Sequence, residues 1–401
     1  MSKDMSRERF DILISGGGVA GLTAATAFGS AGFKVLIVDP YPPITDADAE
    51  GADLRTTAFL QPARDFLDRA GLWDRLSAYA TPLQTMQIVD ASRPDTVERA
   101  FDAEDISDLP FGWNLPNWLL RREMMARIEE LETVEIRLGV GFQDSLARTN
   151  GVIARLTDGT RVDVSLVIGA DGRNSAVRKA AGIEVSTTRY GQHALTFAVA
   201  HDTPHENIST EVHKSGGPFT LVPLPDRDGR PCSAVVWMTD SKEAERLRTI
   251  PTDQFEAEAT ERSGGVLGPL TLVSRRTTWP IISQVADTLI AARTALVAEA
   301  AHVMPPIGAQ GLNMSLTDLS HLLDLSVQHR DDLGGAAMLD AYQRARHGDI
   351  KLRVAGIDML NRTSMAGNPL AQEARRAGIK ALHGIKPIRT RLMQMGLGAK
   401  G

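Results

Sequence analysis

The chain has a single cysteine and no long apolar segment. Cys232 stands alone among 401 residues, which excludes an intramolecular disulfide and any metal site built on paired thiolates. The apolar stretches are of strand length and are interrupted by glycine or charge, well short of the roughly 18 residues that a membrane-spanning helix needs. The opening residues, MSKDMSRERF, lack the apolar region of a secretion signal. We therefore expect a cytoplasmic protein, either free or held peripherally on the inner membrane.

An excess of positive charge is also missing from the chain as a whole. The net charge is −6, which gives no electrostatic argument for binding nucleic acid. No spacing of His, Asp or Glu indicates a metal site. The charge is uneven, however, because residues 371–401 carry seven basic side chains against Glu373 alone. Apolar residues recur in this segment at spacings of three and four, so we predict a basic amphipathic tail over 366–401. Such a tail could bind a membrane surface, a partner subunit or the acidic body of the chain.

The first forty residues have the pattern of a βαβ unit. Residues 10–15 (FDILIS) and 34–39 (KVLIVD) are apolar runs of buried-strand length, and a glycine-rich segment of helix formers lies between them. Short helical and strand patterns then alternate up to about residue 180. The start of the chain therefore predicts a Rossmann-like domain with a parallel sheet.

The pattern changes twice further along the chain. From 183 to about 284, strand-like runs separated by glycine and proline predict an antiparallel sheet, and later segments return to buried-strand and helical patterns. We therefore expect an α/β protein with an inserted substrate domain. We expect the first part of the dinucleotide-binding domain at 8–182 and the antiparallel substrate domain at 183–284. The first domain would return, with C-terminal helices, at 285–365, and the tail would follow at 366–401.

A glycine fingerprint opens the chain. Gly16, Gly18 and Gly21 form G-x-G-x-x-G between the first strand and the helix, and Asp39 closes the second strand. Gly16 permits a tight turn, Gly18 lets the backbone approach a pyrophosphate, and Gly21 allows close packing of helix on strand. The amides of Val19 and Ala20, at the positive end of the helix dipole, would hold the phosphates, and Asp39 would bind the ribose. This pattern alone does not distinguish NAD from FAD.

Two later stretches resolve that choice by resemblance. VIGADGRNSAVRKAAGI (167–183) and EAAHVMPPIGAQGLNMSLTDL (299–319) are similar to the second and third signature motifs of the single-component, FAD-dependent aromatic hydroxylases, the family of para-hydroxybenzoate hydroxylase. ADLRTTAFL (52–60), PNWLLRREM (116–124) and PPIGAQGLNMSLTD (305–318) resemble its ubiquinone-biosynthesis branch. The resemblance covers residues 10–360 and implies FAD as the bound cofactor. It also implies NAD(P)H as a transient co-substrate, and no second glycine fingerprint is present to hold one.

The resemblance also implies roles for single residues. Arg55 and Arg122 match arginines that lie along the FAD chain and its phosphates, and Asp171 matches a residue near the ribityl and pyrophosphate groups. Asp171 could equally cap the helix that follows it. The third motif departs from the family, because Ala298 and Glu299 stand where Gly-Asp is usual. Glu299 keeps the acceptor for a ribityl hydroxyl but is one methylene longer, which puts the affinity for FAD in question.

The third motif combines prolines, which stiffen the backbone, with glycines, which carry no side chain. Pro305 and Pro306 fix φ and donate no amide, so they would form a rigid wall of the substrate pocket. Gly308 and Gly311 let the main chain approach a flat ligand. In the resembled family that ligand is the flavin ring, and the segment Gly311, Leu312 and Asn313 would direct helix N-terminal amides at it. An isolated histidine, His302, between apolar residues is more often structural than catalytic, and no pattern identifies a catalytic side chain.

The resemblance implies a monooxygenase reaction. NAD(P)H would reduce the flavin, molecular oxygen would form a C4a-hydroperoxide, and one oxygen atom would pass to the ring of a polyprenylated phenol in ubiquinone biosynthesis. Two alternatives stay open: hydroxylation of a small soluble aromatic acid, and a flavin-poor scaffold in a quinone-biosynthesis complex, to which the tail could also bind. The ring carbon, the choice between NADH and NADPH and the oligomeric state are not fixed by the sequence.

Overall fold

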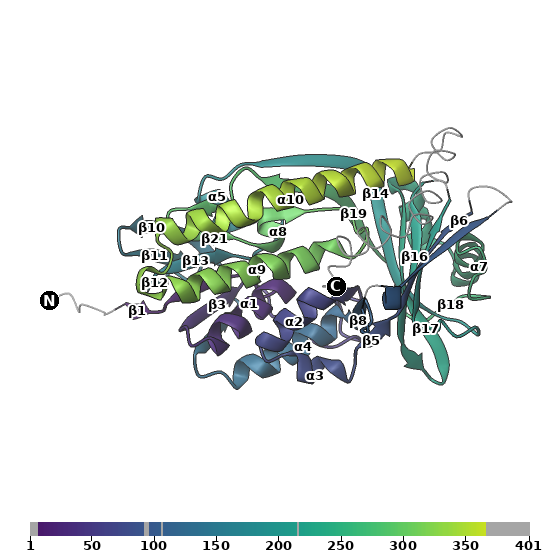
Figure 1. The fold of residues 1–401 in the computed structure, drawn as a ribbon, viewed down its shortest axis with the longest axis horizontal. Helices are drawn as coiled ribbons and strands as arrows, with labels where there is room; N and C mark the ends of the chain where they lie inside the picture. The colour runs from purple at the N-terminus through teal and green to yellow at the C-terminus, as the bar shows by residue number, and fades with distance from the viewer. Residues whose placement is uncertain (1–6, 92–95, 106, 215, 366–401) are drawn as a thin grey trace.

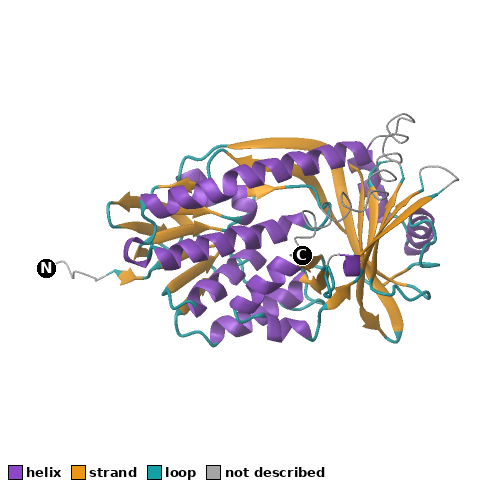
Figure 2. Ribbon diagram, in the orientation of Figure 1, coloured by secondary structure: helices purple, strands orange, loops and turns teal. Residues whose placement is uncertain are grey.

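A parallel sheet with helices against it forms one half of the protein (Figures 1 and 2). The structure is a computed structural model, and it describes residues 7–91, 96–105, 107–214 and 216–365. Five neighbouring strands of this sheet run parallel, and β20 pairs antiparallel at one edge. The strands in spatial order are β20 (Ile290–Ala291), β21 (Thr294–Leu296), β13 (Leu166–Gly169), β2 (Ile12–Ser15), β3 (Val35–Asp39) and β9 (Val134–Leu138).

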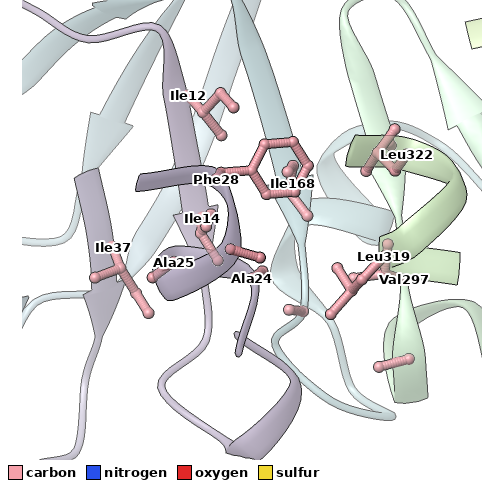
Figure 3. Close-up of a cluster of buried hydrophobic side chains, with 14 of the residues drawn as sticks. Ile12, Ile14, Ala24, Ala25, Phe28, Ile37, Ile168, Val297, Leu319 and Leu322 are labelled. Carbon is pink, nitrogen blue, oxygen red and sulfur yellow. The ribbon is translucent and has the colours of Figure 1, made fainter. Parts of the chain in front are cut away.

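The predicted βαβ unit forms the centre of this half. β2, α1 (Val19–Ser30) and β3 follow one another, and both strands are buried because apolar residues occupy both of their faces. Figure 3 shows α1 and α9 (Gln310–Gln328) packed on the sheet, with Phe28 and Leu322 against Ile168. Burial of such a side chain contributes about 1.5–3 kcal/mol. The Rossmann-like part of the fold prediction is therefore confirmed.

Smaller elements surround the parallel sheet. A four-stranded sheet lies at its end, a short three-stranded sheet leads toward the other half, and further helices pack beside α1 (Figure 1). The strands of these sheets are β1 (Glu8–Arg9), β12 (Arg161–Val164), β11 (Gly151–Leu156) and β10 (Phe142–Arg148), and β4 (Thr56–Leu60), β8 (Gly112–Pro116) and β5 (Thr81–Leu83). The short helices and helical turns are α2 (Gln61–Arg69), α3 (Trp73–Ser77), η1 (Ala103–Asp105), α4 (Asn117–Glu129), α5 (Ala176–Ala180), α8 (Ala298–Ala301) and η2 (Arg330–Asp332).

A large, mainly antiparallel sheet forms the other half. Its order is β22-β19-β14-β17-β16-β15-β6-β7, with β18 beside β14. The bounds are β22 (His302–Val303), β19 (Thr277–Ala286), β14 (Val185–Ala200), β17 (Arg230–Asp240), β16 (Pro218–Arg227), β15 (Ile208–His213), β6 (Thr85–Asp90), β7 (Val97–Asp102) and β18 (Thr271–Leu272). Helices α6 (Ser241–Thr249) and α7 (Thr252–Arg262) are inserted after β17, and their buried residues join the core of this half.

Two features of this sheet differ from the sequence-based expectation. Strands β6 and β7, at 85–102, join the large sheet although they precede the range expected for it, because β6 pairs in parallel with β15. Helices α6 and α7 also lie within the range 183–284, where strands alone were expected. Neither the pairing of β6 with a strand some 120 residues away nor the two helices leave a local signal in the sequence.

Two long helices complete the described chain. The predicted helices at about 312–330 and 336–364 correspond to α9 and to α10 (Ala336–Met365). Figure 1 shows α10 running from the parallel sheet to the ends of β14 and β19. Among the described helices, none is long and apolar enough to cross a membrane. The predicted tail over 366–401 lies outside the described residues.

Candidate active site

A cavity of about 840 Å³ lies between the two sheets. Four segments reach it from the same edge of the parallel sheet, because β2, β3, β13 and β21 all end there. Gly16 follows β2, Asp39 ends β3, Asp171 follows β13 and Glu299 follows β21. Ligands of open α/β sheets bind outside the carboxyl ends of the strands. The sequence motifs, which are dispersed along the chain, thus meet at one place.

The glycine loop has the backbone geometry that its motif demands. Gly16 adopts φ +116°, and a Cβ there would lie 2.4 Å from the carbonyl oxygen of Ala170. A Cβ on Gly21 would lie 1.9 Å from the carbonyl oxygen of Gly16, so this glycine holds α1 against the strand. A Cβ on Gly18 would meet no atom within 4 Å, and Gly18 lines the cavity. The glycine at that position therefore keeps space open for a ligand rather than for packing.

The start of α1 and the end of β3 form the adjoining wall. Val19 and Ala20 line the cavity in the first turn of this 12-residue helix, whose N-cap, Gly18, has no capping side chain. Unpaired amides at a helix N-terminus attract phosphate. One oxygen of Asp39 accepts a hydrogen bond from the amide of Gly17 at 2.5 Å, which fixes the carboxylate beside the loop.

A buried carboxylate holds two arginines at the cavity. Asp53 is 6% exposed and accepts two hydrogen bonds of 2.8 Å from Arg55, with Arg121 at 3.3 Å and Asn117 at 3.0 Å. Burial raises the pKa of Asp53, but the hydrogen bonds and charge of Arg55, aided by Asn117 and Arg121, outweigh it, so the pKa lies below its ordinary value. The guanidinium of Arg55 also lies 4.3 Å above the ring of Trp279 on β19. This cluster therefore links the two halves of the protein.

The structure does not bring Arg122 to the cavity. Its guanidinium contacts Glu123 and lies over the rings of Tyr79 and Trp118, whereas Arg121 lines the cavity. One step along a helix turns a side chain by about 100°, so adjacent arginines on α4 face different ways. The sequence alone does not show which of the two arginines faces the cavity, because that depends on how the helix packs. Asp53 was likewise not singled out, although it stands two residues before Arg55.

Asp171 both lines the cavity and caps a helix. Its carboxylate accepts hydrogen bonds from the amides of Ala176 and Val177 and from the hydroxyls of Ser15 and Ser175. Capping is therefore shown for this side chain, and its place in the cavity wall leaves it available for the role toward FAD that the resemblance implies. Because the capping bonds already fix the carboxylate, Asp171 presents a rigid acceptor at this edge of the cavity.

The third motif contains two alanines in left-handed backbone. Ala298 has φ +53° and Ala309 has φ +56°, a region that is unfavourable for any residue with a Cβ. The resembled family has glycine at the position of Ala298, and glycine adopts a left-handed conformation without strain. The side chain of Glu299 lines the cavity and forms an ion pair of 3.4 Å with Arg173, so the longer acidic side chain has a partner of its own.

The rest of the third motif forms another part of the cavity wall. Pro305, Pro306, Gly311 and Leu312 line the cavity around the N-terminus of the 19-residue helix α9. Asn313 lies beneath this surface, where its side chain accepts from the amide of Leu60 and donates to the carbonyls of Ala58 and Ala309. It therefore holds the helix start against β4. Gly21 and Asn313 are the two predicted site residues that support the cavity without lining it, besides Arg122, which lies away from it.

His302 belongs to a buried ionic network. Its Nε2 lies 2.6 Å from Asp318, whose other oxygen accepts from Arg346 at 2.7 Å, and all three side chains are at most 3% exposed. The network joins β22, α9 and α10. This arrangement supports the structural interpretation of His302.

These features fit a dinucleotide carrying a flavin. The space before Gly18 and the start of α1 suit a pyrophosphate, Asp39 suits a ribose, and the N-terminus of α9 suits an electron-rich ring. The sequence comparisons agree with this geometry. The family described as FAD binding domain matches residues 9–354. The chain belongs to this FAD-binding family.

Similar proteins place the chain among the hydroxylases of the family. It is 34% identical over 394 residues to the ubiquinone hydroxylase UbiL of Rhodospirillum rubrum, covering 97% of this chain and 89% of the relative. It is 25% identical to the 3-demethoxyubiquinol 3-hydroxylase of Escherichia coli, covering 98% and 100%. The crystal structure of p-nitrophenol 4-monooxygenase from Pseudomonas putida superposes with a TM-score of 0.79 at 18% identity, covering 98% and 100%. At 18% identity, the likeness to this crystal structure shows a shared fold alone.

This family member is an FAD-dependent monooxygenase that hydroxylates aromatic rings. NAD(P)H is the electron donor typical of the family. When bound, FAD supplies the chemistry of electron transfer and oxygen activation. Asp39, Asp171 and the N-termini of α1 and α9 lie at the cavity, where they would offer FAD hydrogen-bond acceptors and positive helix ends.

Proposed function

We propose that this hydroxylase acts on the ring of a polyprenylated phenol in ubiquinone biosynthesis. Two relatives that align over almost the whole chain carry ubiquinone or demethoxyubiquinol in their names. The half of the cavity against the large sheet has largely apolar walls, which include Leu83, Met86, Phe111, Val222 and Ile281. Such walls suit an aromatic ring with a long hydrocarbon substituent.

The pairing of the arginines carries this proposal. Three arginines are among the described residues that line the cavity, and each already has a carboxylate partner. Arg55 and Arg121 bind Asp53, and Arg173 pairs with Glu299. A small aromatic acid would need a cation for its own carboxylate, because an unpaired buried charge is costly. The cavity therefore favours an uncharged substituent on the ring over the alternative of a small aromatic acid.

The chain's own residues would position such a substrate. Pro305 and Pro306 form a stiff border near the start of α9, and Trp279 stacks under Arg55 where the two halves meet. We propose that FAD phosphates lie before Gly18 with Arg121 near the FAD chain, so that the flavin ring faces the apolar half.

We further propose that the protein docks on an anionic membrane, where a polyprenylated substrate resides. The basic segment 371–401 supports this proposal, with about 1 kcal/mol for each Lys or Arg near such a surface. On α10, Leu352, Met359 and Leu360 are 75%, 66% and 53% exposed. Deletion of 371–401 should abolish salt-sensitive binding to anionic liposomes while FAD is retained. A full-length protein that ignores such liposomes at low salt would refute the docking.

The substrate class can be tested with purified protein. The protein should be yellow, and a short-chain prenylated phenol should stimulate NAD(P)H oxidation and yield a product heavier by one oxygen atom. A para-hydroxybenzoate control should give neither. Turnover of the benzoate without turnover of the prenylated phenol would replace this proposal with the small-acid alternative. A colourless protein that binds no added FAD would support the scaffold alternative instead.

A further inference from the structure

We propose that Glu211 is the base that removes the proton from the phenolic hydroxyl of the substrate, with His213 as its positioning residue. This inference rests on the proposed function, since it requires a phenol in the cavity. Glu211 and His213 lie on β15, two residues apart and therefore on the same face of the strand. Neither residue belongs to the sequence motifs that bind FAD.

Glu211 lies in the floor of the substrate half of the cavity. It lines the cavity and is only 7% exposed. The register of the large sheet places it beside Thr220 on β16, followed by Val236 on β17 and Thr196 on β14. These three neighbours also line the cavity, and all of them are uncharged. On the β16 side, Glu211 is therefore a carboxylate beside neutral side chains. On the other side the register runs from Glu211 through Ile88 on β6 to Arg99 on β7, and His213 is in register with the buried Asp90.

The partner of Glu211 suits a proton acceptor. One oxygen of Glu211 lies 2.7 Å from Nε2 of His213, and within the described part of the chain its side chain has no other hydrogen bond or ion pair. His213 is 8% exposed, and its Nδ1 is buried without a hydrogen-bond partner in the described part of the chain. A buried carboxylate normally has several hydrogen-bond donors, as Asp53 does. Glu211 thus keeps accepting capacity that a substrate hydroxyl can use.

The chemistry needs no further reagent. The O–H bond of the phenol breaks, its proton passes to the carboxylate of Glu211, and the electron pair stays on the phenolic oxygen. The resulting phenolate is more electron-rich at its ortho and para carbons, where an electrophilic oxygen is accepted. His213 holds the carboxylate in place through Nε2. A general base of this kind contributes about 10²- to 10⁴-fold to a rate.

Glu211→Gln tests this role without a change of volume. In the wild-type protein with oxidised FAD, a bound prenylated phenol should show the absorbance of a phenolate at neutral pH. In E211Q the phenol should bind but stay neutral, and the rate of product formation should fall about 10²-fold or more. Glu98→Gln on β7 is the matched control, because it removes an exposed carboxylate from the same sheet. It should leave the phenolate band and the rate unchanged.

Two further variants separate chemistry from folding. Glu211→Asp keeps the base and should retain the phenolate band with a lower rate, whereas His213→Gln should weaken the band without removing FAD. If E211Q loses FAD, the E211D measurement decides, and absence of the band in that variant overturns the proposal. A phenolate band in E211Q equal to that of the wild type also overturns it. Wild-type protein that does not hydroxylate the prenylated phenol refutes the proposed function instead.

Discussion

Replacement of Ala309 by glycine should stabilise the protein, whereas the same change at Ala298 should be nearly neutral. Both alanines have a left-handed backbone, with φ of +56° and +53°. A Cβ in that region costs about 1–2 kcal/mol. Glycine relieves this strain but adds about 0.4–1 kcal/mol of conformational entropy to the unfolded chain. Strain relief alone therefore gives a net gain of about 0.8 kcal/mol at either position.

Burial separates the two positions. Ala309 is exposed at the N-cap of α9, so its methyl group contributes little. Ala298 is 4% exposed and packs in the core, and loss of a buried methyl costs about 0.8 kcal/mol. That loss cancels the gain at Ala298. The expected change in free energy of unfolding is thus about +0.8 kcal/mol for A309G and about zero for A298G.

Thermal and urea unfolding of the FAD-free and FAD-loaded proteins would measure these changes. With an unfolding entropy of about 2.1 cal/mol/K per residue, 0.8 kcal/mol corresponds to about 1 °C if the chain unfolds as one unit. Urea midpoints, converted to free energy with the slope m, give an independent second readout. A destabilised A309G would refute the argument from backbone strain. A gain in A298G larger than that in A309G would refute the account of burial.

Four other substitutions test the proposed FAD site and the cluster around Asp53. Gly18→Leu should abolish FAD retention at unchanged secondary structure, because its side chain would fill the space before α1; flavin content per folded chain measures this. Arg121→Leu should weaken FAD binding about tenfold or more, and Arg122→Leu should change it little, as titrated by flavin fluorescence. Asp53→Asn should lower the urea midpoint at pH 7 by removing a buried charge partner. Because the folded pKa of Asp53 lies below 3.8, the difference from wild type should persist down to about pH 4 and shrink below it.

The local parts of the fold could be predicted because their signals are local. β2, α1 and β3 follow directly from two buried runs around a glycine turn, and the start of α9 follows from the prolines and glycines before it. The pairing of β6 with β15 could not be predicted, since it depends on contacts between segments that are far apart in the sequence. For the same reason, the boundary between the two halves could be predicted only from changes in the sequence pattern along the chain.

The site divides in the same way. Gly16, Gly18 and Asp39 could be placed from their spacing because strand, turn and helix fix their directions. Arg121 could not be distinguished from Arg122, because the direction of a side chain on α4 depends on how that helix packs. Glu211 gave no signal at all in the sequence, since its position in the cavity arises from the register of β15 in the large sheet.

The order in which the chain is synthesised matters for this architecture. The walls of the cavity that we propose for FAD come from distant parts of the chain, since Gly16 and Asp39 lie near the start of the described chain and Glu299 and Leu312 lie in its last quarter. A ribosome must therefore release almost the whole described chain before β21 and α9 can close the site. Until then, the face of α1 that packs against α9 remains uncovered. Flavin capture is consequently a late event in biogenesis, and a truncated chain that ends before residue 294 should emerge colourless.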